Sequence, residues 1–167
     1  FRKIKIIIVS GEGRSLAVGP IFNILKKNFK VKSFVEKIPN IFTLLTKDVL
    51  LFETNLENTK IFKKLAELIK LSPLPILVAT HLGEIPKDTE QIYKLAQLIP
   101  PYGFLVLNFD DKTINKINDI VKLKSLTFGF EQGADFMASD VNINGGTNFK
   151  INYNGKIIPI WQDSAGK

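Results

Sequence analysis

The residues with the clearest chemical potential are five in a row, Gly11-Glu12-Gly13-Arg14-Ser15, directly after an apolar, β-branched run at residues 4–9. Glycines let backbone N–H groups approach an anion closely, and a cation and a hydroxyl beside them can face phosphate groups and a metal ion. The strict phosphate-loop motif has more residues between its glycines and then Lys, whereas only Glu12 separates the glycines here and Arg14 replaces Lys. An ordinary strand-to-helix turn uses the same residue types, and this alternative stays open.

Polar side chains also follow three other predicted strands, at Glu53, at Thr80-His81 and at Asn108 with Asp110-Asp111. The carboxyl ends of parallel strands share one edge of an α/β sheet, where ligands bind, so we expect these residues to gather beside the glycine loop. Each also has a simpler interpretation. Glu53 can be an exposed carboxylate, His81 a surface or hydrogen-bonded polar residue, and Asp110-Asp111 the cap of a helix that begins near Thr113.

Alternating strands and helices position these residues. Apolar runs predict strands, and 3.6-residue periodicity predicts helices, in the order strand 4–9, strand 31–35, strand 48–52, helix 59–71, strand 74–79, helix 88–99, strand 104–107, helix 113–121 and strand 125–128. Pro20 is tolerated in the first turn of a helix, so the first helix is expected to begin near Gly19-Pro20, after a loop over residues 11–18. Residues 38–45 are expected to form an irregular connection.

From Asp135 onward the pattern changes to alternating apolar and polar residues, which predicts strands at 136–143, 148–153 and 156–161. Turn signals separate them at Asn144-Gly145-Gly146 and at Asn154-Gly155, the second favouring a type I′ turn. The predicted fold is therefore α/β, with a mostly parallel sheet of the P-loop type, flanked by helices and followed by a small antiparallel β-meander. Trp161 and the phenylalanines are expected in the core.

The whole chain is predicted to form a single domain, with residues 1–130 as the parallel core, 131–162 as the hairpin region and 163–167 as the start of a linker. The chain has 167 residues, a net charge of +7 and no cysteine, which excludes disulfides and thiolate metal sites and is consistent with a reducing cytoplasm. The lysines are scattered over predicted helix faces, so no nucleic-acid partner is expected. The apolar runs are far shorter than the roughly 20 residues that span a membrane, so no membrane partner is expected either.

The order of these motifs resembles the central, ATP-binding domain of the Mur ligases. The resemblance covers essentially the whole chain and is most specific at residues 103–111, Gly-Phe-Leu-Val-Leu-Asn-Phe-Asp-Asp, followed by Thr127-Phe128-Gly129. Within that family the chain is most similar to the members that add D-alanyl-D-alanine to the UDP-N-acetylmuramoyl tripeptide. The resemblance implies N-terminal and C-terminal flanking domains that this chain lacks, and the abrupt start in a strand suggests a piece of a longer protein.

The resemblance also implies site residues and cofactors. Gly11 and Gly13 would cradle phosphate, with Arg14 in place of the phosphate-binding lysine and Ser15 in place of the metal-binding threonine. Glu53 would help to bind Mg²⁺. The cofactors implied are ATP and Mg²⁺, which serve to convert a carboxylate into an acyl phosphate that an amine then attacks.

At the end of a later strand, Asn108 would contact adenine, with Asp111 in the same acidic turn. The UDP-linked muramoyl peptide would be bound only through the flanking domains.

The chain departs from the family at catalytic positions. Pro86 stands where the family has a metal-binding histidine, and Ile92 where it has a carbamylated lysine. Lys94 is two positions further along, which is the opposite face of a helix. Two hypotheses follow: an ATP-dependent ligase domain with impaired catalysis, and a catalytically inactive scaffold or interaction module that has lost both cofactors.

Overall fold

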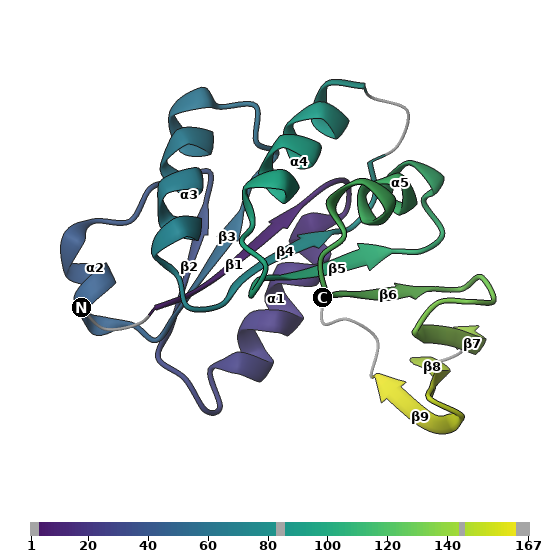
Figure 1. The fold of residues 1–167 in the computed structure, drawn as a ribbon. Coiled ribbons are helices and arrows are strands. Elements are labelled where there is room, and N and C mark those ends of the chain that lie inside the picture. Colours follow the sequence, from purple (N-terminus) through teal and green to yellow (C-terminus); the bar gives the residue numbers. More distant parts are fainter. Residues whose placement is uncertain (1–3, 83–85, 144–145, 163–167) are drawn as a thin grey trace.

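The structure is a computed structural model that describes residues 4–82, 86–143 and 146–162. Its strands form one nine-stranded sheet in the order β2-β3-β1-β4-β5-β6-β7-β8-β9 (Figure 1). Pairing is parallel from β2 to β7 and antiparallel between β7, β8 and β9. The strands are β1 (Lys5–Ser10), β2 (Val31–Val35), β3 (Val49–Glu53), β4 (Pro75–Ala79), β5 (Phe104–Asn108), β6 (Ser125–Gly129), β7 (Phe136–Ile143), β8 (Thr147–Tyr153) and β9 (Lys156–Gln162).

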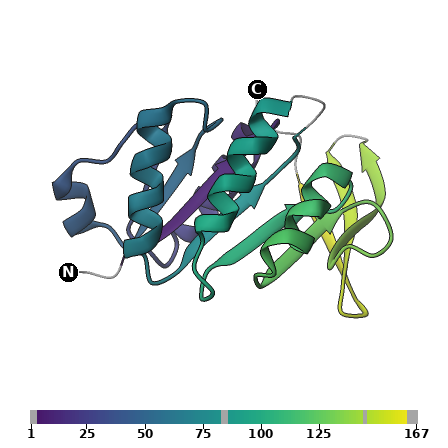
Figure 2. The ribbon, with the colours of Figure 1, turned by 45° about the horizontal axis from the view of Figure 1, so that its top comes forward.

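Helices cover the two faces of the parallel sheet unequally. The main helices α3 (Thr59–Leu71), α4 (Pro86–Leu98) and α5 (Lys112–Val121) lie side by side on one face (Figure 2). The larger hydrophobic core lies beneath them, where Ile8, Leu50 and Leu105 of the sheet meet Leu65 and Ile92 of the helices. These side chains are fully buried, and burying each stabilises the fold by about 1.5–3 kcal/mol.

The opposite face is covered by α1 (Arg14–Leu25), which packs over β1, β2 and β3. A smaller cluster forms there from Ile7, Val9 and Leu51 of the sheet, against Val18 of α1. Side chains alternate between the two faces of a strand, and the register places Glu53 on the same face as Leu51. The mixed α/β fold with a mostly parallel sheet, predicted from the sequence, is therefore confirmed.

The predicted start of the first helix is wrong. Helix α1 begins at Arg14, directly after the glycine loop, and Pro20 lies inside it. Because Pro20 has no N–H, the Leu16 carbonyl lacks the helical hydrogen bond that residue 20 would donate. Both residues are exposed, so water can hydrate this carbonyl. Val18 before the proline and Ile21 after it both pack on the sheet, and this packing holds the helix together across the break.

The connection after β2 also differs from the prediction. A short helix, α2 (Ile41–Thr46), replaces the irregular segment. The Asn40 side chain accepts a hydrogen bond from the Thr43 amide at 3.0 Å and so caps the first turn, a signal that the sequence carried.

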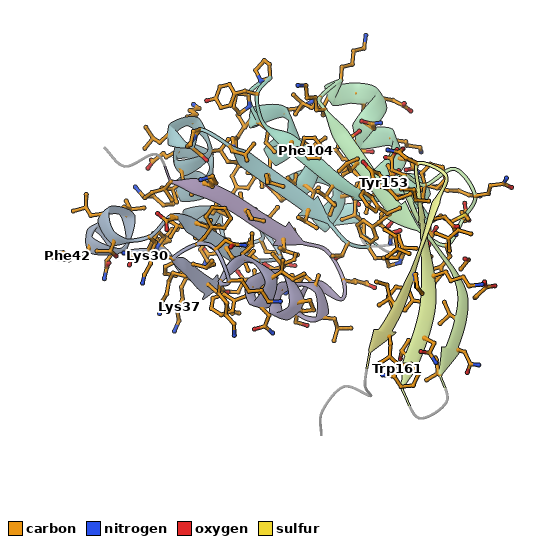
Figure 3. The ribbon with its side chains drawn as sticks, turned by 90° about the horizontal axis from the view of Figure 1, so that it is seen from below. Lys30, Lys37, Phe42, Phe104, Tyr153 and Trp161 are labelled. Atoms are coloured by element: carbon orange, nitrogen blue, oxygen red, sulfur yellow. The ribbon has the colours of Figure 1, made fainter. Side chains whose placement is uncertain are left out.

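The antiparallel meander is confirmed, although it continues the main sheet rather than standing beside it. At the β8–β9 turn both Asn154 and Gly155 have positive φ, as a type I′ turn requires. The prediction that Trp161 is a core residue is wrong, because its side chain is 61% exposed near the free end of the meander (Figure 3). The predicted turn residues 144 and 145 and the predicted linker at 163–167 lie outside the described residues.

Candidate functional site

The glycine loop lies at the carboxyl end of β1, and its two glycines have backbone conformations that other residues rarely adopt. Gly11 has φ +108° and Gly13 has φ +71°. A Cβ atom on Gly11 would stand 2.6 Å from the His81 carbonyl oxygen and 2.7 Å from Thr80 Oγ1, whereas a Cβ on Gly13 would meet open space. Gly11 is therefore required by a close approach to the end of β4, and Gly13 by its conformation alone.

Hydrogen bonds fasten the loop to the residues after β4. The Glu12 amide donates to the His81 carbonyl, and the Thr80 hydroxyl lies 3.1 Å from the Ser10 carbonyl oxygen and 2.6 Å from that of Glu12. The Glu12 amide is thus already used within the protein. The amides that remain to face a ligand are those from Gly13 onward, at the start of α1.

Arg14 is the first residue of α1, and its guanidinium folds back over the loop. Nη1 donates to the Gly11 carbonyl at 3.1 Å, and Nη2 lies 3.9 Å from Oε1 of Glu36. Glu36 follows β2 directly, and Glu53 is the last residue of β3. It had no role in the sequence-based prediction, and its position after a strand is the signal that could have found it.

The two predicted metal ligands are Ser15 and Glu53. Ser15 is exposed in the first turn of α1, and Glu53 is partly buried at the end of β3, paired with Val9 of β1. Within residues 4–82, 86–143 and 146–162, no three His, Cys, Asp or Glu side chains form a group that could hold a metal. Mg²⁺ commonly uses one or two protein carboxylates together with substrate phosphates and water, and the Glu53 carboxylate is a ligand of that type.

Asp111 is a structural carboxylate. It is buried, it caps α5 by accepting from the Thr113 and Ile114 amides at 2.8 and 3.2 Å, and it accepts from the Leu82 amide at 2.7 Å. Burial alone would raise the pKa of this carboxyl, but these amides and the nearby His81 ring outweigh burial and hold the pKa below its ordinary value. The capping interpretation of Asp111 is confirmed.

His81 is a partly exposed polar residue beside Asp111, as the simpler interpretation predicts. Its ring is half exposed, with Nδ1 at 3.0 Å from Asp111 Oδ2. Asp110, next to the cap, accepts hydrogen bonds from the Phe130 and Glu131 amides and so holds the turn after β6. Both residues serve the connections between strands.

An open cavity of about 520 Å³ lies between α1 and the uncovered parts of β4, β5 and β6. It brings together Gly13 of the loop and Asn108 of β5, but Ser15, Glu53 and Asp111 are not among its lining residues. Its other walls are mostly apolar, formed by Leu16, Ala17, Ile21, Val78, Val106 and Phe128, with Glu12, Thr80 and His81 adding polar groups. Phe128 was not predicted here, because its role depends on which face of β6 the helices leave open.

Among the side chains that the structure describes, none of the charged residues of α4 lines the cavity. Ile92 of α4 is fully buried in the core. It stands at the position where the resemblance implies a lysine. Lys94 is exposed and pairs with Glu90 at 2.6 Å. Lys94 therefore does not replace the missing lysine, as its position two residues further along the helix predicted.

The fold and the loop define an α/β protein in which a glycine turn joins the first strand to the first helix. Solved Mur ligases share this fold, including the MurF ligase of Thermotoga maritima in complex with ADP, with a TM-score of 0.70 at 15% identity. That match covers 96% of this chain and 40% of the other. A similar ligase of Acinetobacter baumannii, which adds D-alanyl-D-alanine, has a TM-score of 0.71 at 14% identity, covering 99% and 40%.

Sequence comparison finds the same group. The chain is 35% identical over 98 residues to the UDP-N-acetylmuramate–L-alanine ligase of Sulfurihydrogenibium, 53% of this chain and 21% of that protein. It is 31% identical over 75 residues to a diaminopimelate-adding ligase of Chlamydia pneumoniae, 44% of this chain and 16% of that one. No family model matches. The chain is similar in sequence to Mur ligases over about half of its length, and it spans about a fifth of the length of these curated relatives.

Proposed function

We propose that this chain is the nucleotide-binding domain of a Mur-type ligase, which joins a carboxylate to an amine in the synthesis of peptidoglycan precursors. The observation that carries the proposal is the start of α1, where an uncapped helix end opens on a cavity that also contains Asn108. Sequence similarity to Mur ligases supports the same function.

The phosphates are proposed to lie at the start of α1. Helices α2, α3 and α5 are capped by the side chains of Asn40, Asn58 and Asp111, whereas no described side chain caps α1 and its first turn contains no acidic residue. The positive end of the helix dipole and the amides from Gly13 onward therefore remain for an anion. Arg14 adds a positive charge at the same point, and Arg14 Nε is buried without an acceptor among the described residues.

The adenine base is proposed to enter the cavity between α1 and the sheet. Its mostly apolar walls suit a flat aromatic ring, and one polar group at the edge can fix the orientation of that ring. Asn108 is that group, since a side-chain amide both donates and accepts, as adenine does. Asn108 Oδ1 already accepts from the Asp110 amide at 3.0 Å, which holds the side chain in place.

Mg²⁺ is proposed to lie between the phosphates and the end of β3, with Glu53 and the Ser15 hydroxyl as protein ligands. ATP, when bound, supplies the phosphoryl group that activates the carboxylate substrate. Among Mur ligases, the motifs at 103–111 and 127–129 favour the type that adds D-alanyl-D-alanine. The muramoyl peptide would contact parts of a longer protein outside this chain.

A thermal melt with and without nucleotide tests the proposal. Binding to the folded state alone stabilises a protein by RT ln(1 + [L]/Kd), so ATP with Mg²⁺ at a hundredfold excess over Kd should raise the Tm by about 5–10 °C. Mg²⁺ alone and adenosine alone serve as controls, and neither should approach that shift. An unchanged Tm at millimolar ATP with Mg²⁺ contradicts nucleotide binding.

A catalytically inactive scaffold is the second candidate, favoured by a specific observation on α4. Ile92 is buried in the core, so this position of α4 offers neither a lysine nor a carbamate to the site. The fold requires only its apolar strands and helices and survives without catalysis. Sustained ATP hydrolysis by the protein, abolished by Glu53→Gln, would contradict this second candidate.

A further inference from the structure

Arg14 faces an anion that belongs to the protein itself. Its Nη2 lies 3.9 Å from Glu36 Oε1, and both side chains are partly exposed. Its other hydrogen bond within the described residues goes to the neutral Gly11 carbonyl at 3.1 Å. The guanidinium therefore has one hydrogen bond to a neutral group and one weak ion pair, and that ion pair is with the carboxylate of Glu36.

Glu36 is fixed in place more firmly than Arg14. Its Oε2 accepts from the Thr54 hydroxyl at 3.0 Å, and its Oε1 accepts from the Asn55 amide at 2.8 Å. Its own amide donates to the Glu53 carbonyl at 3.0 Å. Because the residues after β3 hold the carboxylate, it stays beside the loop whether or not Arg14 pairs with it.

From this geometry we infer that Glu36 competes with phosphate for Arg14 and so sets the affinity of the loop for nucleotides. The inference rests on the proposed function. A phosphate group that arrives at the loop must draw the guanidinium away from Glu36, which costs the energy of that ion pair. Glu36 acts through Arg14 and is a positioning residue, which weakens the binding of anions rather than contributing to it.

The expected effect is modest, because a partly exposed ion pair at 3.9 Å is weak. Glu36→Gln removes the charge; its amide oxygen can still accept from the Asn55 amide, and its amide nitrogen can donate to the Thr54 hydroxyl oxygen. It should tighten the binding of ADP, measured by calorimetry in the presence of EDTA, by about two- to fivefold. EDTA excludes a direct contribution of Glu36 to a metal ion. The gain should shrink as salt is raised.

A double-mutant cycle separates competition for Arg14 from simple repulsion. In an Arg14→Ala background, Glu36→Gln should leave the Kd for ADP unchanged, because the group for which Glu36 competes is gone. Glu67→Gln, on the exposed surface of α3, changes the net charge equally and should have no effect. If Glu36→Gln does not fold, Glu36→Asp, which retracts the carboxylate by one methylene, should give a smaller gain in the same direction.

The outcomes distinguish this inference from the proposed function. If the unmodified protein binds ADP and Glu36→Gln binds it equally or more weakly, the inference is overturned while nucleotide binding stands. If the gain persists in the Arg14→Ala background, competition for Arg14 is overturned as well. If the unmodified protein and all variants fail to bind ADP, the proposed function and this inference both fail.

Discussion

The turns after β1 and β5 both join an apolar strand to a helix, but they differ in how each starts its helix. After β5, Asp111 gives its carboxylate to the amides of α5 and to Leu82, so that the protein satisfies that helix end itself. After β1, Gly13 occupies the cap position of α1 and has no side chain to offer. The comparison teaches that a helix end that is satisfied internally is structural, and one left uncapped beside a cavity is the candidate for a ligand.

Removal of the Asp111 carboxylate should have the largest effect on stability. Asp111→Ala abolishes the cap of α5 and leaves the Leu82 amide without its acceptor, so the free energy of unfolding should fall by about 3 kcal/mol. Urea denaturation measures this change. Asp119→Ala, at an exposed position of the same helix, should stay within about 0.5 kcal/mol. Equal losses of unfolding free energy in the two variants would contradict the stabilising role of the Asp111 cap and of its hydrogen bond with Leu82.

The two glycines of the β1 turn should differ from each other. Gly11→Ala places a Cβ against the His81 carbonyl at φ +108° and should destabilise the protein by about 3 kcal/mol. Gly13→Ala meets open space and carries only the strain of its positive φ, about 1 kcal/mol. Thermal or urea unfolding of the pair measures the difference. Equal destabilisation by the two substitutions would contradict the docking of the loop on the end of β4.

The pH dependence of stability should also depend on Asp111. Its pKa is depressed in the folded state, so its contribution is fully present above the unfolded value near 3.8 and is lost as pH falls through the lower folded value. The difference in unfolding free energy between the protein and Asp111→Asn should be constant above about pH 5 and should shrink below about pH 4. A difference that stays constant down to pH 2 would rule out this titration.

Glu53→Gln should have the smallest effect on stability. Within the described part of the chain, no hydrogen bond or ion pair joins its carboxylate to another residue, so the free energy of unfolding should change by less than about 0.5 kcal/mol. Urea denaturation measures this as well. A loss of 2 kcal/mol or more would mean that Glu53 is a structural carboxylate like Asp111.

Much of the fold could be predicted from the sequence, because β-branched runs such as residues 4–9 and the periodicity of α3 are strong local signals. The start of α1 could not, since packing of Val18 and Ile21 on the sheet overrides the local preference of Pro20. In the site, the pattern marked Glu53 and Asp111 alike. The contact of Asp111 with the Leu82 amide, which shows that this carboxylate is structural, depends on the three-dimensional fold and could not be predicted. The same holds for the contact of Arg14 with Glu36.

An NMR titration with ADP and Mg²⁺ tests the central claim most directly, because it observes both helix starts at once. The amide signals of Gly13, Arg14 and Ser15 should shift along one saturable curve, while those of Thr113 and Ile114, already bonded to Asp111, should stay in place. Shifts confined to Thr113 and Ile114, or no saturable shift at Gly13, would contradict the assignment of the nucleotide to the turn after β1.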